Sequence, residues 1–351
     1  MVTGVSMRYF TFYNKPFSLE FLAFFLMNLF LASTSYALNL DKIIVFGDSL
    51  SDTGNVFAFT TKAHQFDPDI PIVPAEPPYY AGRFTNGWVW IEYIAQRKHL
   101  PLMNYAYGGA WGEPTLDSKQ TFPFGLDMQV NFYLADHWQD NKAKHLYVIW
   151  IGANDYIPGR MNIDYATTNT IKTIKQQIDW LVFNGARNFL ILNLPNLGKI
   201  PETVQQGSDK MNQLSELSSV HNKKLLNMLE QARATYPNAK FLLLDIASYF
   251  ELLMQHPLEY QLKNITQACY TGLFKADLAN PKEMHAAEQN NISLMNNFGL
   301  RTAYYAAQLT RLGQQPCVNP DDYLFWDSIH PTRVVHHLIS GLALNLIDKT
   351  A

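Results

Sequence analysis

The chain has few cysteines and little net charge. Its 351 residues include two cysteines, and 27 basic residues against 30 acidic ones leave a formal net charge of -3. Surfaces that bind nucleic-acid phosphates are usually basic, so no nucleic-acid partner is expected. The metal-binding spacings His-Glu-x-x-His and Cys-x-x-Cys are absent, so no metal is expected either. The Gly-x-Ser-x-Gly motif of one large class of serine hydrolases is also missing.

Long apolar runs are missing after the first 37 residues, and no membrane-spanning segment is expected there. Within these 37 residues, Arg8 and Lys15 precede an apolar run at residues 21–32, and Ser35-Tyr36-Ala37 follows it. This order is typical of a secretory signal peptide, here cleaved near Ala37. An uncleaved anchor is the alternative, although the run is short for a bilayer. The predicted location of residues 38–351 is therefore secreted or periplasmic.

The two cysteines, Cys269 and Cys317, both lie in the part predicted to be exported. Disulfides persist in oxidising compartments, so we predict one bridge between them, with two independent buried thiols as the alternative. The bridge would lie in a long insertion at about residues 260–323. There it would shape a lid, hold the turn that follows it, or contribute to stability alone.

Short apolar runs alternate with longer amphipathic ones. The predicted strands are residues 42–46, 102–106, 145–151, 188–194 and 240–246, and the predicted helices are residues 87–96, 163–183, 211–232 and 334–347. This alternation predicts an α/β fold with a parallel sheet covered on both faces. No change in composition requires a second domain, so residues 38–351 are predicted to form one. Residues 57–85 are rich in proline and are expected to be irregular.

The first predicted strand ends in Gly47-Asp48-Ser49. Ligands of open α/β sheets bind beyond the carboxyl ends of the strands, so the Ser49 hydroxyl would project into such a crevice. A hydroxyl there needs a base to become a nucleophile. Asp327 and His330 offer one, because they lie three residues apart just before a helix that Pro331 can begin. Alone, an Asp-x-x-His spacing is mostly structural.

Two further stretches follow predicted strands and can stabilise an oxyanion. Tyr107-Gly108-Gly109-Ala110 offers backbone N–H groups, and Gly152-Ala153-Asn154-Asp155 offers a side-chain amide. The backbone N–H of Ser49 would be a third donor. Each stretch also has a simpler interpretation, as a turn or as a helix cap.

These stretches read GDSL at 47–50, YGGA at 107–110, GAND at 152–155 and DSIH at 327–330. In this order they resemble the four blocks of the GDSL serine esterases, also called SGNH hydrolases. The resemblance implies a flavodoxin-like three-layer α/β/α sandwich with strand order 2-1-3-4-5. It implies Ser49 as nucleophile, His330 as base and Asp327 as its orienting partner, without metal or cofactor. It also implies Ser49, Gly109 and Asn154 as oxyanion donors, with Gly108 as the alternative to Gly109.

Three more stretches resemble the bacterial secreted branch of this family. They are SDTGN at 51–55, PPYYAGRFTNGWVW at 77–90 and NYAYGGA at 104–110. That branch contains phospholipases A, lysophospholipases and glycerophospholipid:cholesterol acyltransferases, so a lipid ester at a membrane or micelle surface is the expected substrate. An esterase of short-chain or acetylated carbohydrate esters is the alternative, and a catalytically silent binding protein is a third possibility.

A lipid site needs an apolar wall beside the reacting groups. Trp111, Tyr156 and Trp326 lie within two residues of Gly109, Asn154 and Asp327 and are the candidates for this wall. The alternative is that these aromatic side chains pack inward as part of the core.

Overall fold

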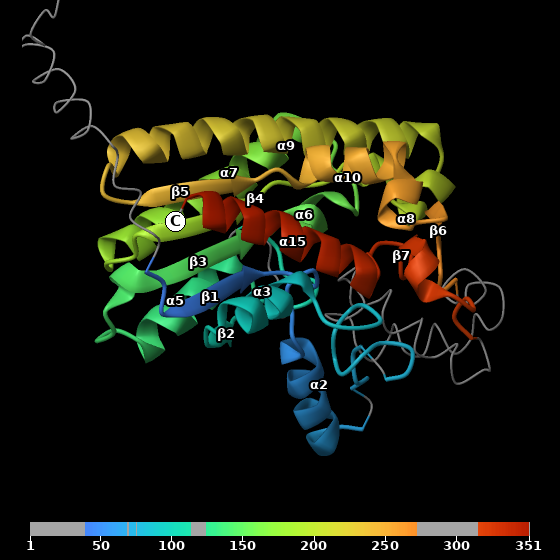
Figure 1. Ribbon diagram of the computed structural model, residues 1–351, viewed down its shortest axis with the longest axis horizontal. Helices are drawn as coiled ribbons and strands as arrows, with labels where there is room; N and C mark the ends of the chain where they lie inside the picture. The colour runs from blue at the N-terminus through green and yellow to red at the C-terminus, as the bar shows by residue number, and fades with distance from the viewer. Residues whose placement is uncertain (1–38, 69, 75, 114–123, 272–314, 351) are drawn as a thin grey trace, which may run out of the picture.

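The computed structural model describes residues 39–350 except 69, 75, 114–123 and 272–314. Its centre is a parallel five-stranded sheet of order β2-β1-β3-β4-β5 (Figure 1). The five strands are β1 (Lys42–Gly47), β2 (Leu102–Asn104), β3 (His145–Trp150), β4 (Asn188–Leu192) and β5 (Lys240–Leu244). This order confirms the predicted flavodoxin-like sheet. The chain passes from β1 outward to β2 and then returns to add β3 on the other side of β1. The strand order therefore reverses between β1 and β3, and such sheets bind ligands at the carboxyl ends of the strands at this switch point.

Helices cover both faces of the sheet and make three layers. The helices are α2 (Asn55–Phe66), α3 (Trp90–Lys98), α5 (Leu126–Asp136), α6 (Ala153–Tyr156), α7 (Ile163–Phe183), α8 (Pro201–Gln205), α9 (Ser208–Thr235), α10 (Ile246–Gln255) and α15 (Arg333–Lys349). Successive strand residues point to opposite faces. Ile43 and Val45 therefore join the core under α3, α10 and α15, whereas Ile44 and Phe46 join the core under α5 and α7. The long helix α9 contributes to both cores.

A small two-stranded sheet lies beside the main one, formed by β6 (Asn264–Ala268) and β7 (Tyr323–Phe325). The predicted disulfide is confirmed, because Cys269 is bonded to Cys317. Cys269 directly follows β6, and its backbone N–H donates to the carbonyl of Phe325 at the end of β7. Most of the chain between the two cysteines lies outside the described residues, as do residues 1–37.

One prediction about local structure was wrong. Residues 57–66, expected to be irregular, belong to α2, which projects from the body of the molecule (Figure 1). The prolines that suggested irregular structure begin only at Pro68, and none lies in the helix. Irregular chain does follow from Asp67 to Val89 in the residues that are described. No helix in the described part of the chain combines the length and apolar character needed to cross a bilayer.

Candidate active site

Ser49 lies in a tight turn at the carboxyl end of β1, which lies between β2 and β3 in the sheet, and we call residues 47–52 the Ser49 turn. A side chain at Gly47 would meet the carbonyl oxygen of Trp150 on the neighbouring strand at 2.5 Å, so only glycine fits there. The Asp48 carboxylate accepts the Leu50 N–H at 3.0 Å and the Asp48 carbonyl accepts the Ser51 N–H at 3.0 Å. These short-range bonds turn the chain sharply and leave the Ser49 side chain at the end of the sheet.

A buried glutamine that the sequence did not single out holds this turn from α5. The Gln129 side chain accepts the Gly47 N–H at 2.8 Å and donates to the Gly47 carbonyl at 2.9 Å. Both backbone groups of Gly47 are thus satisfied by one amide, as buried backbone groups must be. No sequence signal identifies Gln129, because it is an ordinary polar residue within a helix.

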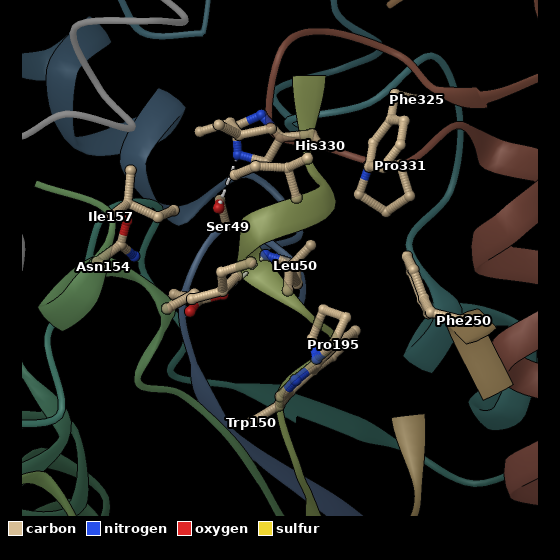
Figure 2. Close-up of a pocket in the computed structure, with 15 residues that line it drawn as sticks. Ser49, Leu50, Trp150, Asn154, Ile157, Pro195, Phe250, Phe325, His330 and Pro331 are labelled. Carbon is tan, nitrogen blue, oxygen red and sulfur yellow. Dashed lines mark hydrogen bonds between the residues drawn. The ribbon is translucent and has the colours of Figure 1, made fainter. Parts of the chain in front are cut away.

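His330 reaches Ser49 from the other end of the chain. Its Nε2 lies 2.8 Å from the Ser49 hydroxyl (Figure 2). Its Nδ1 lies 2.7 Å from a carboxylate oxygen of Asp327. With Nδ1–H donating to Asp327, Nε2 is the acceptor for the Ser49 proton. The structure therefore brings all three residues named from the sequence into one hydrogen-bonded row. All three are buried, with at most 6% of their surface exposed.

Asp327 is held as a carboxylate in this buried position. Burial acts to raise its pKa, but the His330 charge and the hydrogen bonds from His330, Tyr79 and the Ile329 backbone outweigh burial, and the net pKa is lowered. Asp327 thus remains ionised where a charged partner for an imidazolium is required.

The pKa of Asp48, which precedes Ser49, is shifted in the opposite direction. Burial raises the pKa of Asp48 to about 7, although the Leu50 N–H and the His330 charge act to lower it. One of its carboxylate oxygens has no hydrogen-bond partner among the described residues. The two carboxyl groups near this imidazole therefore have pKa values shifted in opposite directions, because only Asp327 is well supplied with donors.

Residues 107–113, which we call the Gly loop, follow β2 and pass close to the end of β1. Gly109 has a φ of 80°, a conformation that favours glycine. The Gly108 N–H donates to Asp52 at 2.8 Å, so it is already engaged. The Asn154 side chain donates to the Ala110 carbonyl at 3.0 Å. The loop and Asn154 are thus joined by this hydrogen bond.

Two buried carboxylates that the sequence did not identify hold the two ends of the Gly loop. Asp52 accepts the N–H of Gly108, and Asp155 accepts the N–H groups of Gly112 and Glu113, both at 2.7 Å. Asp52 also accepts the first N–H groups of α2. Each of the two lies inside a motif quoted from the sequence, SDTGN or GAND, but its contact with the Gly loop depends on the tertiary fold.

An apolar cavity of about 40 Å³ opens beside Ser49 and His330. Its polar members are Asp48, Ser49, Asn154 and His330. Its apolar lining comes from several elements: Leu50, Trp150, Ala153, Ile157, Pro195, Leu197, Ile200, Phe250, Phe325, Ile329 and Pro331. Figure 2 shows Asn154 and Ile157 on one side of Ser49, and Phe250, Phe325 and Pro331 on the other. Ser49 therefore faces an apolar surface built from α6, the chain after β4, α10 and β7.

The three aromatic residues proposed as a wall are not in this lining. Tyr156 is fully buried and hydrogen-bonds His221 at 2.8 Å. Trp326 is buried and stacks on Tyr270. Trp111 lies under the Arg160 guanidinium, 4.9 Å from its ring centre. Sequence proximity to the site residues was misleading, because neighbours in a turn or short helix point to different sides.

Comparisons with known proteins agree with this geometry. The chain matches the family model described as GDSL-like lipase/acylhydrolase over residues 43–341. It is 30% identical over 320 residues to a phosphatidylcholine-sterol acyltransferase of Aeromonas hydrophila, covering 88% of this chain and 90% of that protein. It is 28% identical to a thermolabile hemolysin of Vibrio parahaemolyticus, covering 89% of this chain and 65% of that one.

A secreted effector protein of Salmonella typhimurium is also 28% identical over 307 residues, which are 85% of this chain and 62% of that one. The present chain thus spans less than two thirds of the length of the hemolysin and of the effector.

Proposed function

The chain belongs to the GDSL-like lipase/acylhydrolase family, and on that premise we propose that it cleaves carboxylic esters of lipids through an acyl-enzyme on Ser49. The proposed substrates are lysophospholipids and phospholipids. The acyl group passes to water or, in a transferase reaction, to an alcohol such as a sterol. The relative from Aeromonas hydrophila, named for acyl transfer from phosphatidylcholine to a sterol, supports this substrate class.

In the proposed mechanism, His330 takes the proton of Ser49 as the Ser49 oxygen bonds to the ester carbonyl carbon. The negative charge that develops on the carbonyl oxygen is met by the N–H groups of Ser49 and Gly109 and by the Asn154 amide. Asp327 stabilises the imidazolium. Collapse breaks the ester bond, and His330 gives its proton to the leaving alcohol. Water or an acceptor alcohol then repeats the sequence on the acyl-enzyme and releases Ser49.

One observation carries this proposal: the hydrogen-bonded row from Ser49 to Asp327 ends at an apolar cavity. The Ser49 hydroxyl and His330 Nε2, 2.8 Å apart, are both part of the cavity lining. An acyl chain attached to Ser49 would therefore meet Leu50, Ile157 and Phe250 rather than polar side chains. Burial of each methylene on such a surface contributes about 0.8 kcal/mol.

The size of the cavity favours short-chain esters as the second candidate. About 40 Å³ is small beside the roughly 300–1,000 Å³ of typical ligand pockets. A long acyl chain would require side chains such as Phe250 to move. A short acyl group would fit with less rearrangement.

The experiment is fatty-acid release from lysophosphatidylcholine by residues 38–351, with Ser49→Ala beside it. We expect release by the wild type and a loss of about 10⁶-fold in the variant, the size seen when a serine nucleophile is removed. Equal melting temperatures would show that the variant is folded. Release that persists in Ser49→Ala would exclude the mechanism. Labelling of Ser49 by a fluorophosphonate without any release would retain the mechanism and exclude lysophospholipids as substrates.

A series of p-nitrophenyl esters of increasing chain length separates the two substrate classes. Phe250→Ala should enlarge the cavity and move the preference toward longer chains. Phe241→Ala is the matched control, because Phe241 is equally buried but lies in the core on the other face of the sheet. A preference for acetyl and propionyl esters in the wild type would favour the short-chain alternative.

We further propose that residues 1–37 are a secretory signal peptide and that residues 38–351 form one hydrolase domain outside the cytoplasm. The relative named as a secreted effector is consistent with export. Mass spectrometry of protein recovered from the periplasm and medium of an expressing bacterium tests this. A mature chain that begins after Ala37 is expected, and a chain that retains Met1 in the membrane fraction would contradict it.

A further inference from the structure

A tyrosine from the proline-rich segment contacts Asp327. The Tyr79 hydroxyl donates to a carboxylate oxygen of Asp327 at 2.6 Å, although the two residues are 248 positions apart. The same oxygen accepts the Nδ1–H of His330 at 2.7 Å. Tyr79 is 1% exposed, so water does not compete for this bond.

This bond differs from the others that Asp327 accepts. Its second oxygen accepts the backbone N–H groups of Ile329 and His330, and its first oxygen accepts the His330 side chain. All of these come from the turn that contains Asp327, residues 326–331, which we call the His330 turn. Among the described residues, Tyr79 is the one donor from outside that turn. It therefore fixes the carboxylate relative to the rest of the molecule.

Tyr79 belongs to residues 77–86, a segment that packs along the His330 turn. The Phe84 ring lies 5.4 Å from the His330 ring, and the Thr85 hydroxyl donates to the Pro331 carbonyl at 2.8 Å. The Asn86 side chain accepts the Arg333 N–H at the start of α15. These contacts continue along the whole segment, so the Tyr79 bond is part of an extended interface.

We propose that Tyr79 is a positioning residue for the reaction: it orients the Asp327 carboxylate toward His330 Nδ1 and limits the basicity of that carboxylate. The proposal rests on the proposed function, in which Asp327 orients the base. By holding the oxygen that faces the imidazole, Tyr79 restricts rotation of the carboxylate. By donating to the same oxygen, it withdraws part of the charge that would otherwise stabilise the imidazolium.

The hydroxyl keeps its proton throughout the working range. Burial, and then the charge and hydrogen bond of Asp327, raise the pKa of Tyr79 well above 10, so it remains a donor at neutral and alkaline pH. The titratable groups that face His330 are Asp327 on its own turn, Asp48 on the Ser49 turn, His336 on α15 and Tyr79. Tyr79→Phe removes one donor and leaves the other three groups in place.

The test compares Tyr79→Phe with wild type on one ester substrate across pH. We expect kcat to fall about 10-fold with KM unchanged, because a hydrogen bond to a charged group is lost while the cavity is not altered. Loss of the donor makes Asp327 more basic and favours the imidazolium. The acid limb of the kcat/KM profile should therefore move up by about half a pH unit.

Tyr80→Phe is the matched control, because Tyr80 is the next residue and is 44% exposed. It should match wild type. A double-mutant cycle with Asp327→Asn gives a second readout: Tyr79→Phe should have little further effect in that background. An unchanged kcat and pH profile in Tyr79→Phe would overturn the proposal. An equal loss with and without Asp327 would overturn it as well.

The rate of Ser49 labelling by a fluorophosphonate separates this proposal from the proposed function. Slower labelling of Tyr79→Phe than of wild type supports positioning, whatever the natural ester is. Equal labelling rates overturn the role of Tyr79 and leave the serine mechanism intact. A wild type that does not label at all overturns both.

Discussion

The Ser49 turn and the His330 turn meet at one hydrogen bond but are supported in different ways. The Ser49 turn ends strand β1, which lies between two neighbours in the main sheet, and Gly47 pairs with Trp150 on β3. Its closing hydrogen bonds join residues two to four positions apart, and Gln129 on α5 holds Gly47 at its start. The His330 turn lies outside the main sheet, after the short strand β7. Besides its own short-range hydrogen bonds, it is supported by distant segments, including Tyr79 and the disulfide-bonded strand β6.

The difference follows from where each turn lies in the fold. A strand buried between two neighbours fixes the direction in which its last residues leave the sheet. A turn after a two-stranded ribbon has less support, because such a pair is marginally stable alone. Here the Tyr270 N–H donates to the Trp326 carbonyl at 2.7 Å and the Glu202 N–H donates to the Ser328 carbonyl at 2.9 Å. We therefore expect substitutions far from the site to disturb His330 more readily than Ser49.

The largest expected effect comes from Asp327→Asn. This substitution removes the negative charge from the His330 turn and leaves the Ser49 turn unchanged. The amide cannot stabilise an imidazolium and favours the wrong tautomer, so kcat should fall about 10⁴-fold. The measurement is kcat on a soluble ester. Asp321→Asn is the control, because Asp321 lies nearby in an exposed ion pair with Arg333. A loss below tenfold in Asp327→Asn would contradict the role given to this carboxylate.

Removal of the disulfide by Cys269→Ser with Cys317→Ser tests the remote support of the His330 turn. The bridge joins residues 48 positions apart, and its loss should lower the free energy of unfolding by about 2–4 kcal/mol. Because Cys269 is hydrogen-bonded to Phe325 next to the turn, activity on all esters should fall by a similar factor. Urea unfolding and a panel of esters provide the measurements. A change confined to long-chain esters would indicate a lid instead.

Gly108→Ala probes the packing of Phe84 against the His330 turn. The added methyl would lie 2.1 Å from the Phe84 ring, which packs on His330, so either the loop or the ring must shift. We expect a loss of about 1–3 kcal/mol in stability and a lower kcat. Gly341→Ala is the matched control, since its methyl meets nothing within 4 Å in helix α15. Its stability should be unchanged or slightly raised.

The smallest expected effect concerns the pH dependence contributed by Asp48. Burial raises the pKa of Asp48 to about 7, so the folded protein binds this proton more tightly than the unfolded chain. The resulting stabilisation is complete below the unfolded pKa and is lost as pH rises through about 7. The free energy of unfolding should therefore decline progressively between pH 5 and pH 8. Asp48→Asn should reduce that decline in thermal unfolding series, and an identical slope would contradict it.

Much of the fold was predictable because its signals are local. The runs at residues 42–46 and 145–151 are β-branched, aromatic and continuous, and the helix at residues 163–183 has the bounds predicted for it. Helix α10 was not predicted, although its buried residues Ile246, Phe250 and Leu253 have helical spacing, because its first residue was assigned to the strand predicted at residues 240–246. Helix α2 was not predicted either, because the prolines that follow it suggested irregular structure for the whole stretch.

By itself, the sequence determined the chain order of the five main strands, the family and the motifs that contain Ser49, Asp327 and His330, because each depends on residues close together in the chain. The tertiary structure alone decided that Tyr79 donates to Asp327, that Gln129 holds Gly47, and that the cavity is lined by residues such as Phe250. It also decided that Trp111, Tyr156 and Trp326 lie outside that lining. Local patterns show which residues are apolar or reactive, but which of them meet depends on how distant elements pack.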